Sequence, residues 1–130
     1  MGKSKIVLVN NSATELNKME EKIESIFPEA VIEKYTDPMY AVKYILDNEV
    51  EMVFAEAQMQ RIDGFQLLHI CKVNKPECSL FITDKSHNLI SREDAKECGA
   101  DGYFQTPLTK EQVMDAYCIV QKKVSEGGSC

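Results

Sequence analysis

Polar side chains follow several short apolar runs of this sequence, and their types limit the chemistry they could support. Asn10 and Asn11 follow KIVLV, Glu56 follows EMVFA, and Thr83 and Thr106 close two later runs. Clustered carboxylates at such positions could hold Mg²⁺ for phosphoryl transfer, whereas amides and hydroxyls are weaker ligands. Because Glu56 is the one carboxylate among these five residues and none is cationic, the set favours a polar pocket over a working phosphoryl-transfer site.

Other kinds of site find little support in the sequence. No GxGxxG or Walker pattern occurs, and the loop of residues 10–14 has no glycine that could cradle a flavin or nucleotide phosphate. The five cysteines include no CxxC pair. His69 and Cys71 are two residues apart on an expected helix, so they point to different faces. We therefore expect reduced thiols, no metal centre and no cofactor, with Mg²⁺ binding weak or absent.

Length and charge narrow the class of protein. The chain of 130 residues suits one domain, which we expect over residues 1–124, with a flexible tail at residues 125–130. A net charge of −6 argues against nucleic-acid binding. No apolar run is long enough for a membrane span or a signal peptide, so we expect a cytoplasmic protein.

Strand-like and helix-like patterns alternate along the chain. The expected strands are Lys5–Asn10, Ala30–Tyr35, Glu51–Ala55, Ser79–Thr83 and Tyr103–Phe104. Ser12, Asp37, Ser91 and Thr109 are expected helix N-caps, a further helix is expected at about Phe65–Lys72, and Gly99 is an expected helix end. This alternation predicts an α/β fold: a flavodoxin-like, doubly wound sheet of five parallel strands in the order 2-1-3-4-5, with five helices. Ligands of such sheets lie at the carboxyl ends of the strands, which places the polar residues above around one pocket.

Residues 5 to about 122 resemble the receiver domain of two-component response regulators. Four segments carry the resemblance, in order and at similar spacing: KIVLVNN, EAQMQRIDGFQLL, SLFIT and AKECGADGYFQTP. The resemblance implies the same doubly wound fold and a role in two-component or phosphorelay signal transduction.

The resemblance also implies a role for each pocket residue. It places Glu56 at the phosphoacceptor aspartate, Asn10 and Asn11 at the acidic pair that helps bind Mg²⁺, Gln60 at a loop proline, Thr83 and Tyr103 at the switch pair, and Thr106 at a lysine. Pro107 follows Thr106, and receivers have a cis peptide bond there, so we expect one here.

These departures from the family pattern predict that phosphorylation chemistry is lost. Glu56 is one methylene longer than aspartate, the acidic pair is neutral, and the lysine is replaced by a threonine. Asp84 follows Thr83 and would add an anion that repels phosphate. We expect Glu56 to accept hydrogen bonds from Asn10, Asn11 or Thr83, because a partly buried carboxylate without partners is costly.

The hypothesis that follows is a non-catalytic, receiver-like signalling module that acts by protein–protein interaction without aspartyl phosphorylation. By the resemblance, its partners are other signalling proteins that bind the fourth helix, fifth strand and fifth helix, and a homodimer is an open possibility. Two alternatives are kept: an active receiver phosphorylated by an unusual route, and a small-molecule binder on the same fold.

Overall fold

Five parallel strands form one sheet in the order β2-β1-β3-β4-β5, which confirms the predicted topology. The computed structural model describes residues 4–86 and 89–128. The strands are β1 (Lys5–Val9), β2 (Val31–Tyr35), β3 (Met52–Glu56), β4 (Ser79–Asp84) and β5 (Gly102–Gln105). All four neighbouring pairs are parallel, so the strands end along the same edge of the sheet.

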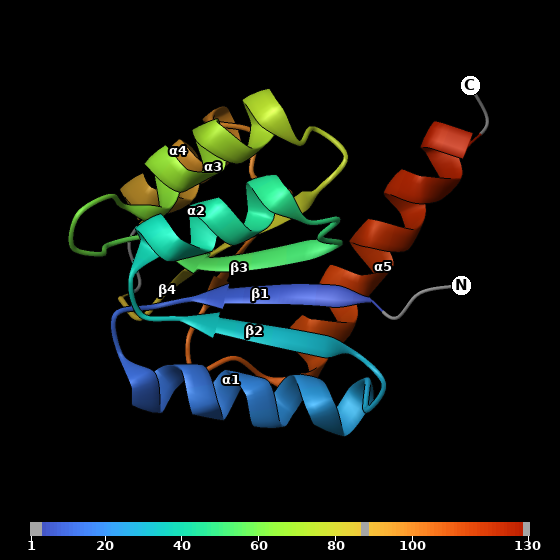
Figure 1. Ribbon diagram of the computed structural model, residues 1–130, viewed down its shortest axis with the longest axis horizontal. Helices are drawn as coiled ribbons and strands as arrows, with labels where there is room; N and C mark the ends of the chain where they lie inside the picture. Colours follow the sequence, from blue (N-terminus) through green and yellow to red (C-terminus); the bar gives the residue numbers. More distant parts are fainter. Residues whose placement is uncertain (1–3, 87–88, 129–130) are drawn as a thin grey trace.

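Helices cover both faces of this sheet. They are α1 (Ala13–Ile26), α2 (Pro38–Asp47), α3 (Gly64–Asn74), α4 (Leu89–Glu97) and α5 (Lys110–Gly128). Figure 1 shows α2, α3 and α4 on one face, whereas α1 and α5 lie on the other. The molecule therefore has three layers, as expected when right-handed crossovers join parallel strands.

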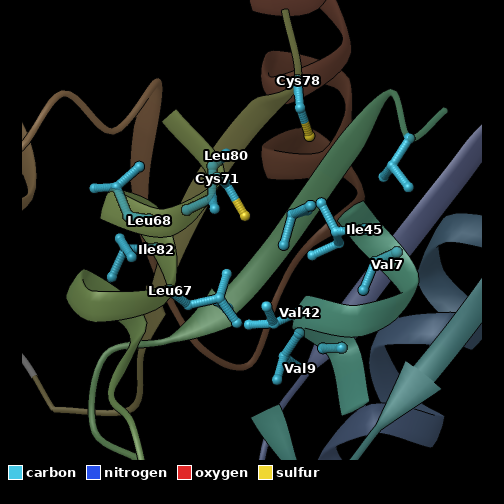
Figure 2. Close-up of a cluster of buried hydrophobic side chains, with 14 of the residues drawn as sticks. Val7, Val9, Val42, Ile45, Leu67, Leu68, Cys71, Cys78, Leu80 and Ile82 are labelled. Carbon is cyan, nitrogen blue, oxygen red and sulfur yellow. The ribbon is translucent and has the colours of Figure 1, made fainter. Parts of the chain in front are cut away.

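Two apolar clusters fill the spaces between the layers. The first lies under α2 and α3 and includes Val7 and Val9 of β1, Leu67 and Cys71 of α3, and Ile82 of β4, as Figure 2 shows. The second lies under α1 and α5, where the rings of Phe54, Phe81 and Phe104 pack together. Strand residues alternate between the two clusters because successive side chains point to opposite faces. This alternation leaves Glu56 and Thr83 on the α1/α5 side and Asp84 and Tyr103 on the other.

Local hydrogen bonds explain most helix starts. Ser12 and Asp37 accept the backbone N–H groups of Glu15 and Met39 at 3.2 and 2.9 Å. Thr109 and Gln112 form a reciprocal capping box, with bonds of 3.0 and 3.1 Å. Gly99 adopts a φ of 88° after α4, as a helix-ending glycine often does. These four predictions are confirmed.

The fourth and fifth helices differ from expectation. Ser91 was expected as an N-cap, which is wrong, because α4 begins at Leu89 and Ser91 lies inside it. The residues before Leu89, 87–88, lie outside the described ones. Residues 125–128 were expected in the flexible tail, yet α5 continues to Gly128. An established helix adds one hydrogen bond per further residue, so it can extend into polar sequence. Ser129 and Cys130 of the predicted tail lie outside the described residues. Within the described part of the chain, no helix is long and apolar enough to cross a membrane.

Candidate functional site

The centre of the site is the Glu56 carboxylate at the carboxyl end of β3. Its Oε1 accepts the Thr83 hydroxyl at 3.1 Å and the Asn10 amide at 3.3 Å, and its Oε2 accepts the Lys85 N–H at 3.3 Å. The side chain is buried, with 5% of its surface exposed. Thr83 is its register neighbour on β4, which explains the short contact. The predicted pairing of Glu56 with Asn10 and Thr83 is confirmed.

The backbone around Glu56 is tightly packed against the start of α3. A Cβ on Gly64 would lie 2.5 Å from the Glu56 carbonyl oxygen, closer than real Cβ atoms approach. Gly64 therefore lets the helix begin directly beside the site. The Asp63 side chain caps this helix through a bond of 2.9 Å from the Gln66 N–H, which forms a capping box that was not predicted from the sequence.

Each of the two asparagines uses both the oxygen and the nitrogen of its side-chain amide in hydrogen bonds. Asn10 Oδ1 accepts the Ser12 N–H at 2.9 Å while its Nδ2 donates to Glu56. Asn11 Nδ2 donates to the Thr36 carbonyl at 2.9 Å, and its Oδ1 accepts the Gln60 N–H at 2.7 Å. A carboxylate could replace the acceptor in each case but not the donor. Asn11 therefore joins the loops that follow β1, β2 and β3, and of the three alternative donors to Glu56 the structure uses Asn10 and Thr83.

Burial dominates the electrostatics of Glu56. Removal from water raises the pKa of this carboxyl, while the bonds from Thr83 and Lys85 work in the opposite direction. The negative charge of Asp84 raises the pKa further. The carboxylate is thus held by donors in a place that is unfavourable for its charge.

A pocket of about 390 Å³ opens beside Glu56. Its lining residues are Asn10, Asn11, Ser12, Glu15, Glu56, Gln58, Lys85 and Thr106. Four of the predicted residues therefore meet, whereas Thr83 is fully buried and reaches the pocket only through Glu56. Lys85 corrects the expectation of a pocket without a cation, because this exposed lysine is among the lining residues although Thr106 is neutral. The sequence signal for Lys85 was its place directly after a strand.

Asp84 does not face the pocket, which corrects the expectation of a second anion beside Glu56. Its Oδ2 accepts the Tyr103 hydroxyl at 2.6 Å, and its Oδ1 accepts the N–H and hydroxyl of Ser86 at 3.0 and 2.9 Å. It is 2% exposed. Because strand residues alternate, the carboxylate lies on the α4 side of the sheet. Its charge acts on Glu56 through the sheet and not by direct contact.

Tyr103, the expected switch aromatic, lies beside α4. Its ring packs against the first apolar cluster, and the Arg92 guanidinium lies 5.7 Å from the ring centroid. The peptide bond between Thr106 and Pro107 is cis, as expected.

The donor set does not fit the Mg²⁺ that the resemblance associates with this edge of the sheet. Glu56 supplies the one carboxylate at the matching positions, and its two oxygens already accept three hydrogen bonds. Asn10 and Asn11 direct their oxygens to backbone N–H groups. Nowhere in residues 4–86 and 89–128 do three His, Cys, Asp or Glu side chains form a group that could hold a metal ion.

Comparisons with known proteins agree on the fold. The CheY-like response regulator receiver domain protein of Methanospirillum hungatei JF-1 superposes with a TM-score of 0.85 at 14% identity, over 96% of this chain and 99% of that one. The signal receiver domain of an HD domain-containing protein from Pseudomonas fluorescens Pf-5 gives 0.84 at 17% identity, over 95% and 99%. The chain therefore has the fold of response-regulator receiver domains.

Two sequence relatives match most of this chain. Protein-glutamate methylesterase/protein-glutamine glutaminase 3 of Geobacter sulfurreducens is 28% identical over 127 residues, 95% of this chain. This chain spans about a third of that relative, 34% of its length. Protein PilG of Pseudomonas aeruginosa is 22% identical over 114 residues, 86% of this chain and 83% of that protein. No protein-family model matches the chain. Both relatives are less than 30% identical to this chain, so the comparisons establish the fold and not a family.

Proposed function

We propose that this chain is a receiver-like module that signals through protein–protein contacts, without aspartyl phosphorylation and without bound Mg²⁺. The proposal includes a cytoplasmic setting and a two-component or phosphorelay context, both of which rest on the resemblance. In this proposal the chain itself performs no catalysis.

The observation that carries the proposal is the hydrogen bond from Asn10 Nδ2 to Glu56 Oε1. At the corresponding place a receiver needs carboxylates that repel one another until a cation joins them. Here an amide donor takes the place of the cation, and the carboxylate is satisfied by protein groups alone. Asn11 likewise uses its amide for protein groups alone, since it joins the loops that follow β1, β2 and β3.

The proposed partner surface comprises α4, β5 and α5. A second pocket of about 390 Å³ lies between α4 and β5, lined by residues that include Arg92, Lys96 and Tyr103. On α5, Met114 is 43% exposed, which is large for an apolar side chain. The hydrogen bond from the Tyr103 hydroxyl to Asp84 fixes the Tyr103 ring at this surface, and Glu56 takes no part in that bond. A surface fixed in this way can bind a partner constitutively.

Melting curves and mass spectrometry test the proposal. We expect Mg²⁺, alone or with beryllofluoride or a small phosphoryl donor, to leave both the melting temperature and the mass of the wild type unchanged. The variant Asn10→Asp/Asn11→Asp is expected to melt lower than wild type without Mg²⁺ and to recover when Mg²⁺ is added, since bound ligand stabilises the folded state. A Mg²⁺-dependent rise in the wild type, or a phosphate on any carboxylate, contradicts the proposal.

One observation favours a second candidate, an active receiver phosphorylated by an unusual route. Lys85 brings a cation to the rim of the pocket, and its N–H already contacts Glu56. Phosphate on Glu56 that is lost in Lys85→Met would establish this candidate. A small molecule that copurifies in the pocket would instead favour the third hypothesis, a ligand-binding module.

A further inference from the structure

Two lysines contact one carboxylate oxygen at the end of the sheet where the strands begin, opposite to the end that carries Glu56. Lys72 of α3 and Lys123 of α5 lie 3.0 and 3.6 Å from Asp101 Oδ2. The same oxygen accepts the Leu80 N–H at 2.8 Å. Lys123 also donates to the Cys78 carbonyl at 3.4 Å. The three side chains are partly buried, with 26%, 33% and 17% of Lys72, Lys123 and Asp101 exposed.

The charges of this cluster do not balance when both lysines are protonated. Two ammonium groups face one carboxylate, so the cluster carries an excess of one positive charge. Lys72 lies closer to Asp101 than Lys123 does. Lys123 therefore gives up a proton with the smaller loss of electrostatic attraction to Asp101. Burial, assisted by the neighbouring Lys72 ammonium, lowers the pKa of Lys123 below its usual value, although Asp101 partly offsets both.

From this geometry we infer that Lys123 is a site of covalent acylation by small acyl phosphates. A lysine beside a second cation and partly removed from water is a known arrangement for a nucleophilic amine. Its N–H donates to the Cys78 carbonyl, and the Asp101 carboxylate attracts the ammonium form from 3.6 Å, so the nitrogen is held in place. One third of the side chain remains exposed, so a small reagent can reach it. The Lys72 ammonium favours a donor whose leaving group is an anion.

The reaction balances without any further reagent. The neutral Lys123 amine attacks the acyl carbon, a C–N bond forms, and the bond from that carbon to the phosphate oxygen breaks. Phosphate leaves with the electron pair and takes up the proton released by the nitrogen. The product is a neutral amide, and Asp101 is left paired with Lys72 alone. Acylation thus removes the excess charge of the cluster.

Acetyl phosphate is the probe for a direct test. The folded protein is incubated with it at neutral pH, digested and mapped by mass spectrometry for acetyl groups on each lysine. Lys123 is expected to be acetylated severalfold faster than Lys122, its exposed neighbour, because a lowered pKa leaves a larger fraction of the Lys123 amine neutral at this pH. Equal rates at Lys122 and Lys123 would overturn the inference.

A matched pair of variants separates the effect of Lys72 from a general loss of charge. Lys72→Met should slow acetylation at Lys123 to the rate of Lys122. Lys75→Met removes a lysine three positions later, directly after α3, whose acidic partner is Glu49 at 3.8 Å, and should leave the rate unchanged. Circular dichroism confirms that both variants fold. An unchanged Lys123 rate in Lys72→Met also overturns the inference. The same spectra report any phosphate on carboxylates, so the outcome for Lys123 is independent of the outcome for Glu56.

Discussion

The backbone N–H of Gln60 donates to Asn11 Oδ1 at 2.7 Å, across 49 positions of sequence. By the resemblance to receiver domains, both residues stand where that pattern has another type, an acidic residue at position 11 and a proline at position 60. Proline has no N–H, so this bond requires a residue such as Gln60. The amide of Asn11 then reaches the Thr36 carbonyl, which a carboxylate could not do. The two departures therefore support one another and tie the loops of the site together.

This relationship predicts the result of Asn11→Asp. The variant keeps the acceptor for Gln60 but loses the donor to Thr36 and adds an anion near Glu56. We expect a loss of about 0.5–1.5 kcal/mol in the free energy of unfolding, measured in urea. Asn17→Asp is the matched control on α1, because it makes the same chemical change while keeping the oxygen that accepts from Lys34. Equal effects of the two substitutions would show that the Asn11 bridge contributes nothing.

A second prediction concerns the dependence of stability on pH. Burial raises the pKa of Glu56 in the folded protein, so the folded state holds this proton more tightly than the unfolded state. As pH rises from the unfolded pKa through the folded one, the wild type should lose stability relative to Glu56→Gln, by at most about 1.4 kcal/mol per pH unit. Above the folded pKa the difference should level off. Urea curves between acid and neutral pH measure it, with the exposed Glu29→Gln as control. A difference that does not change with pH contradicts the prediction.

The sequence alone was sufficient to predict the fold and part of the site. The alternation of apolar runs and helical patterns is a local signal that predicts a parallel α/β sheet, and the strand order followed from right-handed crossovers and the usual topology for a domain of this size. The contact between Glu56 and Asn10 followed from the rule that strand ends meet at one edge of a parallel sheet, together with the cost of an unpaired buried carboxylate.

Contacts between loops could not be predicted in this way. The bond from Gln60 to Asn11 joins two irregular loops, and no periodicity relates them. Asp84 was expected beside Glu56 because it follows Thr83, but alternation along β4 turns its side chain to the other face. Lys85 was missed because a long side chain after a strand end can reach several places, and the chosen one depends on neighbouring loops.

A third prediction tests the bond between Tyr103 and Asp84. Tyr103→Phe removes a donor from a carboxylate that is 2% exposed, so we expect a loss of about 1.5–3 kcal/mol in the free energy of unfolding. Since Arg92 and the apolar cluster also contact the ring, a double-mutant cycle with Asp84→Asn is needed to isolate the bond. The expected coupling energy is about 0.5–3 kcal/mol. Additive effects of the two substitutions would mean that Asp84 does not hold the ring.

A fourth prediction separates the cysteines by reactivity. Burial raises the pKa of Cys71 to about 11 and that of Cys78 to about 12, whereas Cys98 and Cys118 are exposed. Only the thiolate reacts with iodoacetamide, and at pH 8 the two buried thiols are about 0.1% and 0.01% ionised. We expect rapid alkylation of Cys98 and Cys118, while Cys71 and Cys78 react only when the core opens. Peptide mapping with and without urea measures this, and the peptide that carries Cys130 is scored separately. Alkylation of Cys71 or Cys78 at the rate of Cys98 in the native protein would show that the core under α3 is open to solvent.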